Sequence, residues 1–76
     1  SPQEYRLLKF FLENEGKIIA REEIVIVVWS DAKTSEGISE AAIDQMIHRL
    51  RKKIEEEPNN PKHIVTVKGR GFRFTP

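Results

Sequence analysis

The chain has 76 residues, no cysteine and a formal net charge of +1, from 13 basic and 12 acidic side chains. This length fits one domain over residues 1–76, and the lack of cysteine excludes disulfides and thiolate metal sites. No secretory signal is recognisable and no apolar run approaches the ~18 residues of a membrane span, so we expect a cytoplasmic, non-membrane domain.

The charges are unevenly distributed along the chain. Residues 1–40 hold 5 basic and 8 acidic side chains, a balance of −3, whereas residues 41–76 hold 8 basic and 4 acidic, a balance of +4. We therefore expect the C-terminal half to bind a polyanion.

The first residues predict the start of a helix. Ser1 can cap it, Pro2 suits the first helical position, and Glu4 completes a capping box. The helix should run to about Asn14 and stop at Gly16.

This first helix is apolar on two sides. The main apolar stripe follows helical spacing and consists of Tyr5, Leu8, Phe11 and Leu12. Leu7 and Phe10 point away from this stripe, so we expect them to pack against a second partner outside the sequence.

The middle of the chain gives mixed signals. Residues 17–20 predict a short strand, and residues 21–23, Arg-Glu-Glu, carry the acidic side chains that suit a helix start. Residues 24–29 are ambiguous, because their β-branched side chains favour a strand on propensity alone. Residues 30–37 are polar and predict a loop.

The clearest helix covers residues 39–56. Ser39 can cap it, and the prolines and asparagines at 58–61 end it. Its core stripe consists of Ile43, Met46, Ile47, Leu50 and Ile54. The opposite face carries Ala41, Gln45, His48 and Lys52, flanked by Arg49, Arg51 and Lys53.

This helix face suits DNA, because an α-helix fits the major groove of the B-form duplex. Gln45 can pair with adenine, and His48 could donate to a guanine acceptor. The flanking cations can neutralise phosphates. The alternative is a solvated basic face.

A β-hairpin is predicted at the C-terminal end, with strands at 64–67 and 72–74. Its turn carries Lys68 and Arg70 among glycines, and Arg73 follows, so a contact with a minor groove is possible. The alternative is a plain turn. Phe72 and Phe74 share one strand face and are predicted to be core.

The sequence contains no recognisable catalytic or nucleotide-binding motif. We therefore expect neither an enzyme nor a cofactor or metal site.

The remaining charged and aromatic residues are predicted to have structural roles. Glu55, Glu56 and Glu57 should solvate a helix end, and Trp29 should be core or half-buried. Asp44 and Glu40 could orient basic side chains or repel phosphate.

Four segments of the sequence match a known pattern: Ser-Pro-Gln-Glu-Tyr-Arg-Leu-Leu at 1–8, Arg-Glu-Glu with Trp29 at 21–29, Arg-Leu-Arg-Lys-Lys-Ile at 49–54 and Ile-Val-Thr-Val-Lys-Gly-Arg-Gly-Phe-Arg-Phe at 64–74. In these segments, which together span nearly the whole chain, the sequence resembles the C-terminal effector domains of OmpR/PhoB-type response regulators.

The resemblance implies an α+β winged helix-turn-helix fold with three helices and a C-terminal β-hairpin wing. It implies a helix over 21–29, a recognition helix at 39–56 and a wing at 64–75. The family's N-terminal sheet is absent from this sequence, and Leu7 and Phe10 lie where it would pack.

The resemblance also implies sequence-specific binding of double-stranded DNA in bacterial transcription regulation. Base-facing positions would be Ala41, Gln45, His48 and Arg70. Phosphate-binding positions would be Arg49, Arg51, Lys52, Lys68 and Arg73. Loop 30–37 would contact RNA polymerase, a receiver or other sensory domain would lie upstream, and homodimers would bind tandem half-sites.

Several positions depart from the family pattern. Ala41 stands where a polar residue is frequent, and Ala20 replaces a frequent capping serine, which weakens the helix that follows. Ile26 and Val27 replace polar residues and leave apolar surface exposed. They motivate the alternative function, a winged helix that binds proteins without binding DNA.

Overall fold

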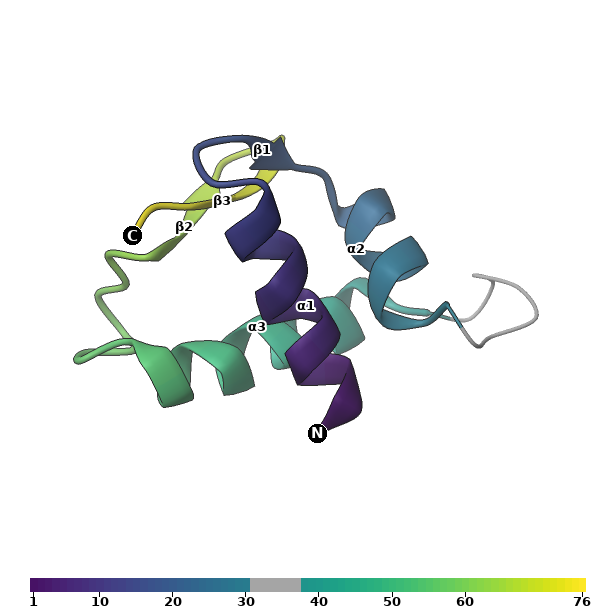
Figure 1. Ribbon diagram of the computed structural model, residues 1–76, viewed down its shortest axis with the longest axis horizontal. Coiled ribbons are helices and arrows are strands. Elements are labelled where there is room, and N and C mark those ends of the chain that lie inside the picture. The colour runs from purple at the N-terminus through teal and green to yellow at the C-terminus, as the bar shows by residue number, and fades with distance from the viewer. Residues whose placement is uncertain (31–37) are drawn as a thin grey trace.

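The computed structural model describes residues 1–30 and 38–76 (Figure 1). In chain order the elements are α1 (Pro2–Glu13), β1 (Ile18–Ile19), α2 (Arg21–Val28), α3 (Glu40–Ile54), β2 (Ile64–Val67) and β3 (Gly71–Phe74). The strands form one antiparallel sheet in the order β1-β3-β2. The predicted α+β class, with three helices and a C-terminal hairpin, is confirmed.

Helix α1 begins and ends where its sequence predicts. The Ser1 hydroxyl accepts the Glu4 N–H at 3.3 Å, and Pro2 occupies the first turn. Asn14 is the C-cap, and Gly16 follows with φ of 80°. The Gly16 N–H donates to the carbonyl of Phe74 at 2.9 Å, so the end of α1 is joined directly to the sheet.

The buried face of α1 differs from the prediction. Leu7 and Phe11 are completely buried, whereas Tyr5 is 67% and Leu12 is 50% exposed. The prediction that Leu7 points to an outside partner was wrong, and Phe10 is partly buried against the same core. A periodicity pattern shows that two faces are apolar, but only the packing of α1 on α2 and α3 decides which one is covered.

Residues 21–28 form helix α2 despite their β-branched side chains. Ile24 and Val28 are four residues apart and both completely buried, so helical spacing gives the core two side chains from one face. The helix implied by the resemblance is confirmed, and a strand here is excluded. Trp29 is the C-cap and packs against the core in a half-buried position.

The α2 N-terminus lacks a side-chain cap, and this gives a test. Ala20 has the extended backbone of an N-cap, with φ of −72° and ψ of 154°, whereas the Ser39 hydroxyl at the start of α3 accepts the Ala42 N–H at 3.1 Å. We expect Ala20→Ser to raise the free energy of unfolding in urea by about 1 kcal/mol and Ser39→Ala to lower it by a similar amount. An Ala20→Ser variant no more stable than the parent would contradict this.

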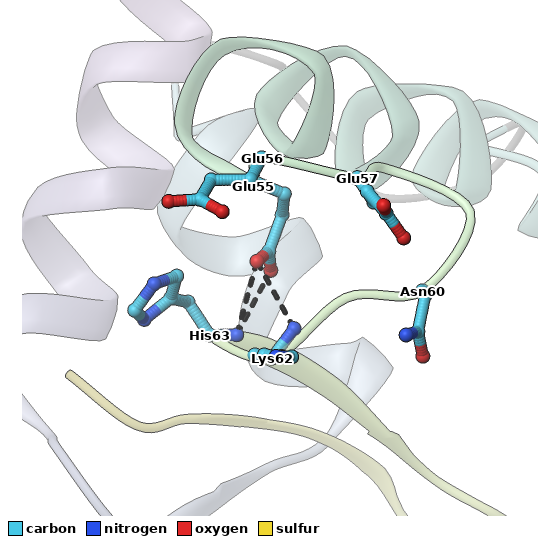
Figure 2. Close-up of a pocket in the computed structure, with 6 residues that line it drawn as sticks. All are labelled: Glu55, Glu56, Glu57, Asn60, Lys62 and His63. Carbon is cyan, nitrogen blue, oxygen red and sulfur yellow. Dashed lines mark hydrogen bonds between the residues drawn. The ribbon is translucent and has the colours of Figure 1, made fainter.

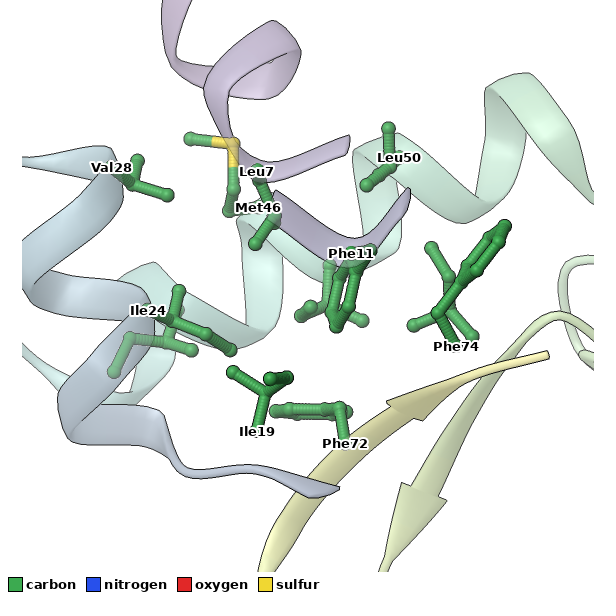
Figure 3. Packing of buried hydrophobic residues seen from close by; sticks show 12 residues of the cluster. Leu7, Phe11, Ile19, Ile24, Val28, Met46, Leu50, Phe72 and Phe74 are labelled. Carbon is green, nitrogen blue, oxygen red and sulfur yellow. The ribbon is translucent and has the colours of Figure 1, made fainter. Parts of the chain in front are cut away.

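One hydrophobic core joins the three helices and the sheet (Figure 3). Phe72 and Phe74 enter it from β3, as predicted, and Phe74 stacks on Phe11 with ring centroids 6.1 Å apart. The buried hydrophobic side chains are Leu7, Phe11, Ile19, Ile24, Val28, Ile43, Met46, Ile47, Leu50, Ile64, Phe72 and Phe74. The core therefore fixes α3 against the hairpin, and their outer surfaces can act together.

Candidate nucleic-acid interface

Helix α3 divides into a buried and an exposed face, as its periodicity predicts. Ile54, the last member of the core stripe, is only partly buried. The helix ends there, two residues before the predicted end at 56, because Glu55 turns into extended backbone with ψ of 141°. The other members of the stripe are buried: Ile43, Met46, Ile47 and Leu50.

The exposed face of α3 carries polar side chains that make no hydrogen bond with other described residues. The predicted residues Ala41, Gln45, His48, Arg49 and Lys52 are all exposed. Among the described residues, no hydrogen bond or ion pair engages Gln45 or His48. Their amide and imidazole groups are therefore free to bind a partner.

Arg51 has a partner within the domain. Its Nε and Nη2 atoms donate to the carbonyl of Ile64 at 3.1 and 2.7 Å, and Nη2 also donates to the Thr66 hydroxyl at 2.9 Å. Burial lowers the pKa of Arg51 from its ordinary value, against the opposing effect of the Glu55 carboxylate. Arg51 thus joins α3 to β2, a role that the sequence pattern did not indicate.

Glu55 makes a second link between α3 and β2 (Figure 2). The residue is 8% exposed, and its carboxylate accepts the backbone N–H groups of Lys62 at 3.0 Å, His63 at 3.0 Å and Ile64 at 2.8 Å. The prediction of a solvated acidic end was wrong for Glu55, because three backbone donors need an acceptor there. Glu56 and Glu57 are exposed, as predicted.

The pKa of Glu55 reflects this environment. Burial raises the pKa of the carboxyl group, but the backbone donors at Ile64, Lys62 and His63 outweigh burial and hold it below its ordinary value. Glu55 therefore stays ionised at neutral pH, as its acceptor role requires.

Asp44 orients an arginine, one of the two roles considered for it. Its Oδ1 atom lies 2.8 Å from Nη1 of Arg21, at the start of α2. The Arg21 guanidinium also lies over the Phe72 ring, 5.1 Å from its centroid. Arg21, which was not among the predicted site residues, therefore connects α2, α3 and β3.

The hairpin projects cations beside the start of α3. Lys68 and Arg70 are exposed at its turn, and the Arg70 N–H donates to the Val67 carbonyl at 2.9 Å. A pocket of about 310 Å³ lies between the α2 N-terminus and the hairpin, and its lining includes Glu40 and Arg70. The N-terminal end of α3 and the hairpin turn therefore border the same hollow.

Arg73 differs from the other hairpin cations. It lies in the middle strand, paired with Ile18 on one side and Val65 on the other, and is only partly exposed. The structure thus places the predicted cations in two settings, an exposed turn and the outer face of the sheet.

Some expected features fall outside this interface. Of the predicted loop at 30–37, residues 31–37 lie outside the described part of the chain. Within the described residues, no group of three or more His, Cys, Asp or Glu side chains could hold a metal ion. No described helix combines the length and apolar character that crossing a membrane requires.

Three helices with an antiparallel hairpin packed beside the third define a winged helix-turn-helix domain. The family model for the C-terminal domain of transcriptional regulatory proteins matches residues 1–74. The chain therefore belongs to this family of DNA-binding transcription-regulatory domains, as the OmpR/PhoB-type resemblance predicts.

Individual relatives agree with this assignment. The chain is 37% identical to the sensory transduction protein RegX3 of Mycolicibacterium smegmatis, over 95% of this chain and 30% of RegX3. It superposes on the Thermotoga maritima response regulator DrrB, an OmpR/PhoB homologue, with a TM-score of 0.81 and 36% identity, over 100% of this chain and 33% of DrrB.

A DNA-bound structure is also similar. The Klebsiella pneumoniae RstA DNA-binding domain, in complex with the RstA box, superposes with a TM-score of 0.82 and 25% identity, over 100% of this chain and 72% of that domain. The chain spans about a third of the length of the curated relatives it matches.

Proposed function

We propose that this domain binds specific sequences of double-stranded DNA and serves as the effector part of a bacterial response regulator in the cytoplasm. Helix α3 enters the major groove, and the wing, residues 64–75, contacts the adjacent minor groove. The observation that carries this proposal is the exposed face of α3, where Gln45 and His48 have no partner among the described residues and the wing turn lies nearby.

The proposed contacts separate into two groups. Base contacts come from Ala41, Gln45, His48 and Arg70. Phosphate contacts come from Arg49, Lys52, Lys68 and Arg73. For Arg51, which was predicted to bind a phosphate, we propose a structural role instead, because its guanidinium already donates to Ile64 and Thr66.

The phosphate contacts determine how binding responds to salt. We expect Lys68→Ala to reduce the slope of log Kobs against log salt concentration by about one, because one fewer counterion is released. Lys9→Ala, a change at an exposed cation of α1, is the matched control and should leave the slope unchanged. Equal slopes for the parent and the Lys68→Ala variant would remove this residue from the interface.

The family also motivates proposals for the whole regulator. We propose an upstream receiver or other sensory domain, since the chain covers only about a third of RegX3 and DrrB. Homodimerisation on tandem half-sites and a contact with RNA polymerase through residues 30–37 rest on the family resemblance. Footprinting with one and with two half-sites tests the first of these, because a dimer protects paired sites cooperatively.

A second candidate function rests on α2. Ile26 is 70% exposed, and a large aliphatic side chain on the outer face of a helix can anchor a protein partner. Capture of a partner that requires Ile26 and survives loss of Arg70 would support a protein-binding winged helix over the DNA-binding function.

A further inference from the structure

The wing is attached to the rest of the domain on both of its strands at one level, the cross-strand pair of Thr66 and Phe72. On β2, the Thr66 hydroxyl accepts a hydrogen bond from Nη2 of Arg51 at 2.9 Å. On β3, the Phe72 side chain is buried in the core (Figure 3). The next pair of the register leads directly to the exposed turn, residues 68–70. The direction in which this turn projects therefore depends on how the pair is held.

Arg51 holds the pair from α3. Its Nε and Nη2 atoms donate to the Ile64 carbonyl at 3.1 and 2.7 Å, in addition to the bond to Thr66. Its guanidinium carbon also lies 6.0 Å from the centroid of the Phe72 ring. The N–H donors of a guanidinium are fixed in one plane, so these contacts together define one orientation of the hairpin against α3.

A second arginine contacts the same ring from α2. The guanidinium carbon of Arg21 lies 5.1 Å from the centroid of Phe72, and its Nη1 atom lies 2.8 Å from Oδ1 of Asp44. Asp44 directly precedes Gln45, one of the proposed base contacts. A continuous set of contacts therefore joins the part of α3 that carries Gln45 to the base of the wing.

A fixed wing has a consequence for a protein that contacts two grooves of one duplex. A wing that moves freely must be ordered when it binds, and the lost conformational freedom is subtracted from the affinity that its contacts provide. A wing that is already held in the folded domain avoids most of this cost on binding.

We infer that Arg51 is a positioning residue for DNA binding: through Thr66 and the Ile64 carbonyl, it holds the wing turn where both the turn and α3 reach one duplex. The inference rests on the proposed DNA-binding function. It goes beyond that function because it assigns the energetic coupling between the two groove contacts to a side chain whose partners lie within the domain.

The test is a double-mutant cycle between Arg51→Lys and Arg70→Ala. Affinities are measured at one salt concentration for a duplex that the 76-residue chain selects from a randomised library. Lysine keeps the positive charge but lacks the planar fork of donors. Thr66→Val, a second variant, removes only the hydroxyl acceptor. Arg6→Lys is the matched control, because Arg6 donates from α1 to the Val28 carbonyl in α2 at 3.3 Å.

We expect Arg70→Ala to weaken the parent roughly 5- to 150-fold, as for loss of one base contact. Arg51→Lys should weaken the parent about 2- to 10-fold, the cost of immobilising one more side chain on binding. It should weaken the Arg70→Ala variant much less, because the wing then has little contact to position. Thr66→Val should give the same pattern with a smaller factor, and Arg6→Lys should change neither affinity.

The outcomes separate this inference from the proposed function. If Arg51→Lys weakens the parent and the Arg70→Ala variant by the same factor, Arg51 acts independently of the wing and the inference is overturned, while DNA binding stands. Urea denaturation checks that each variant is folded, and if Arg51→Lys is not, the same comparison with Thr66→Val decides. Failure of the parent to select any motif, with no salt-dependent binding, would overturn the proposed function and the inferred positioning with it.

Discussion

Replacement of Gly71 by alanine should lower the free energy of unfolding by about 3–5 kcal/mol, because the added methyl group would cause both backbone strain and a steric clash. Gly71 has φ of 136°, a conformation that residues with a side chain rarely adopt, and it begins β3 beside β1. A Cβ atom there would lie 2.0 Å from the carbonyl oxygen of Ile19. That oxygen belongs to backbone, so relief of the clash requires the separation of β1 from β3.

Gly69 is the matched control for this effect. It also has positive φ, 76°, but an added Cβ would meet no atom within 4 Å. Gly69→Ala should therefore cost only the conformational penalty of about 1–2 kcal/mol. Urea denaturation of both variants separates the clash from the conformational penalty. Equal losses of stability would show that β1 does not confine Gly71.

Loss of the Glu55 carboxylate should be the next largest effect. Glu55→Ala leaves the N–H groups of Lys62, His63 and Ile64 without their acceptor, and a buried donor left unpaired costs about 1–3 kcal/mol. Since some of these groups can reach water, we expect a loss of about 3 kcal/mol in the free energy of unfolding. Glu56→Ala, at the exposed neighbour, should change it by less than about 0.5 kcal/mol.

The same carboxylate should make stability depend on pH. The pKa of Glu55 is lower in the folded state, so its contribution is fully present above the ordinary glutamate pKa and is lost as pH falls through the folded-state value. The difference in stability between the parent and Glu55→Ala should therefore shrink in acid. A difference that stays constant from neutral pH to well below the ordinary pKa would contradict this role.

The stability of the Glu55→Ala variant should still depend on pH, because Glu4 is a second carboxylate with a lowered pKa in the folded state. A hydrogen bond from Lys53 lowers the pKa of Glu4, against the opposing effect of burial. Its contribution has the same sign as that of Glu55, since both carboxylates have a lowered pKa when folded. The variant should thus remain less stable in acid than at neutral pH.

Local sequence patterns predicted the elements that carry the interface. The spacing of Ile43, Ile47 and Leu50 defined the buried face of α3, and this alone placed Gln45 and His48 on the outside. In α2, by contrast, β-branched propensity favoured a strand, and packing of Ile24 and Val28 in the core overrode it.

Contacts between distant segments could not be predicted in the same way. The hydrogen bonds of Arg51 to β2 and of Glu55 to residues 62–64 join parts of the chain whose relation depends on the complete fold. The burial of Leu7 could not be predicted either, because two faces of α1 are apolar and only the packing of the assembled helices decides which one is covered. In both cases the sequence identified the side chain but not the neighbour that determines its role.

The two links from α3 to β2 also protect an edge of the sheet from other chains. Ile64 lies on the outer strand, where unpaired backbone groups can recruit a strand from another molecule. Its N–H is taken by Glu55 and its carbonyl by Arg51. The opposite edge, β1, is only two residues long. Side chains at the end of α3 thus occupy the outward backbone groups at the first residue of this edge strand, where a strand from another molecule would otherwise begin to pair.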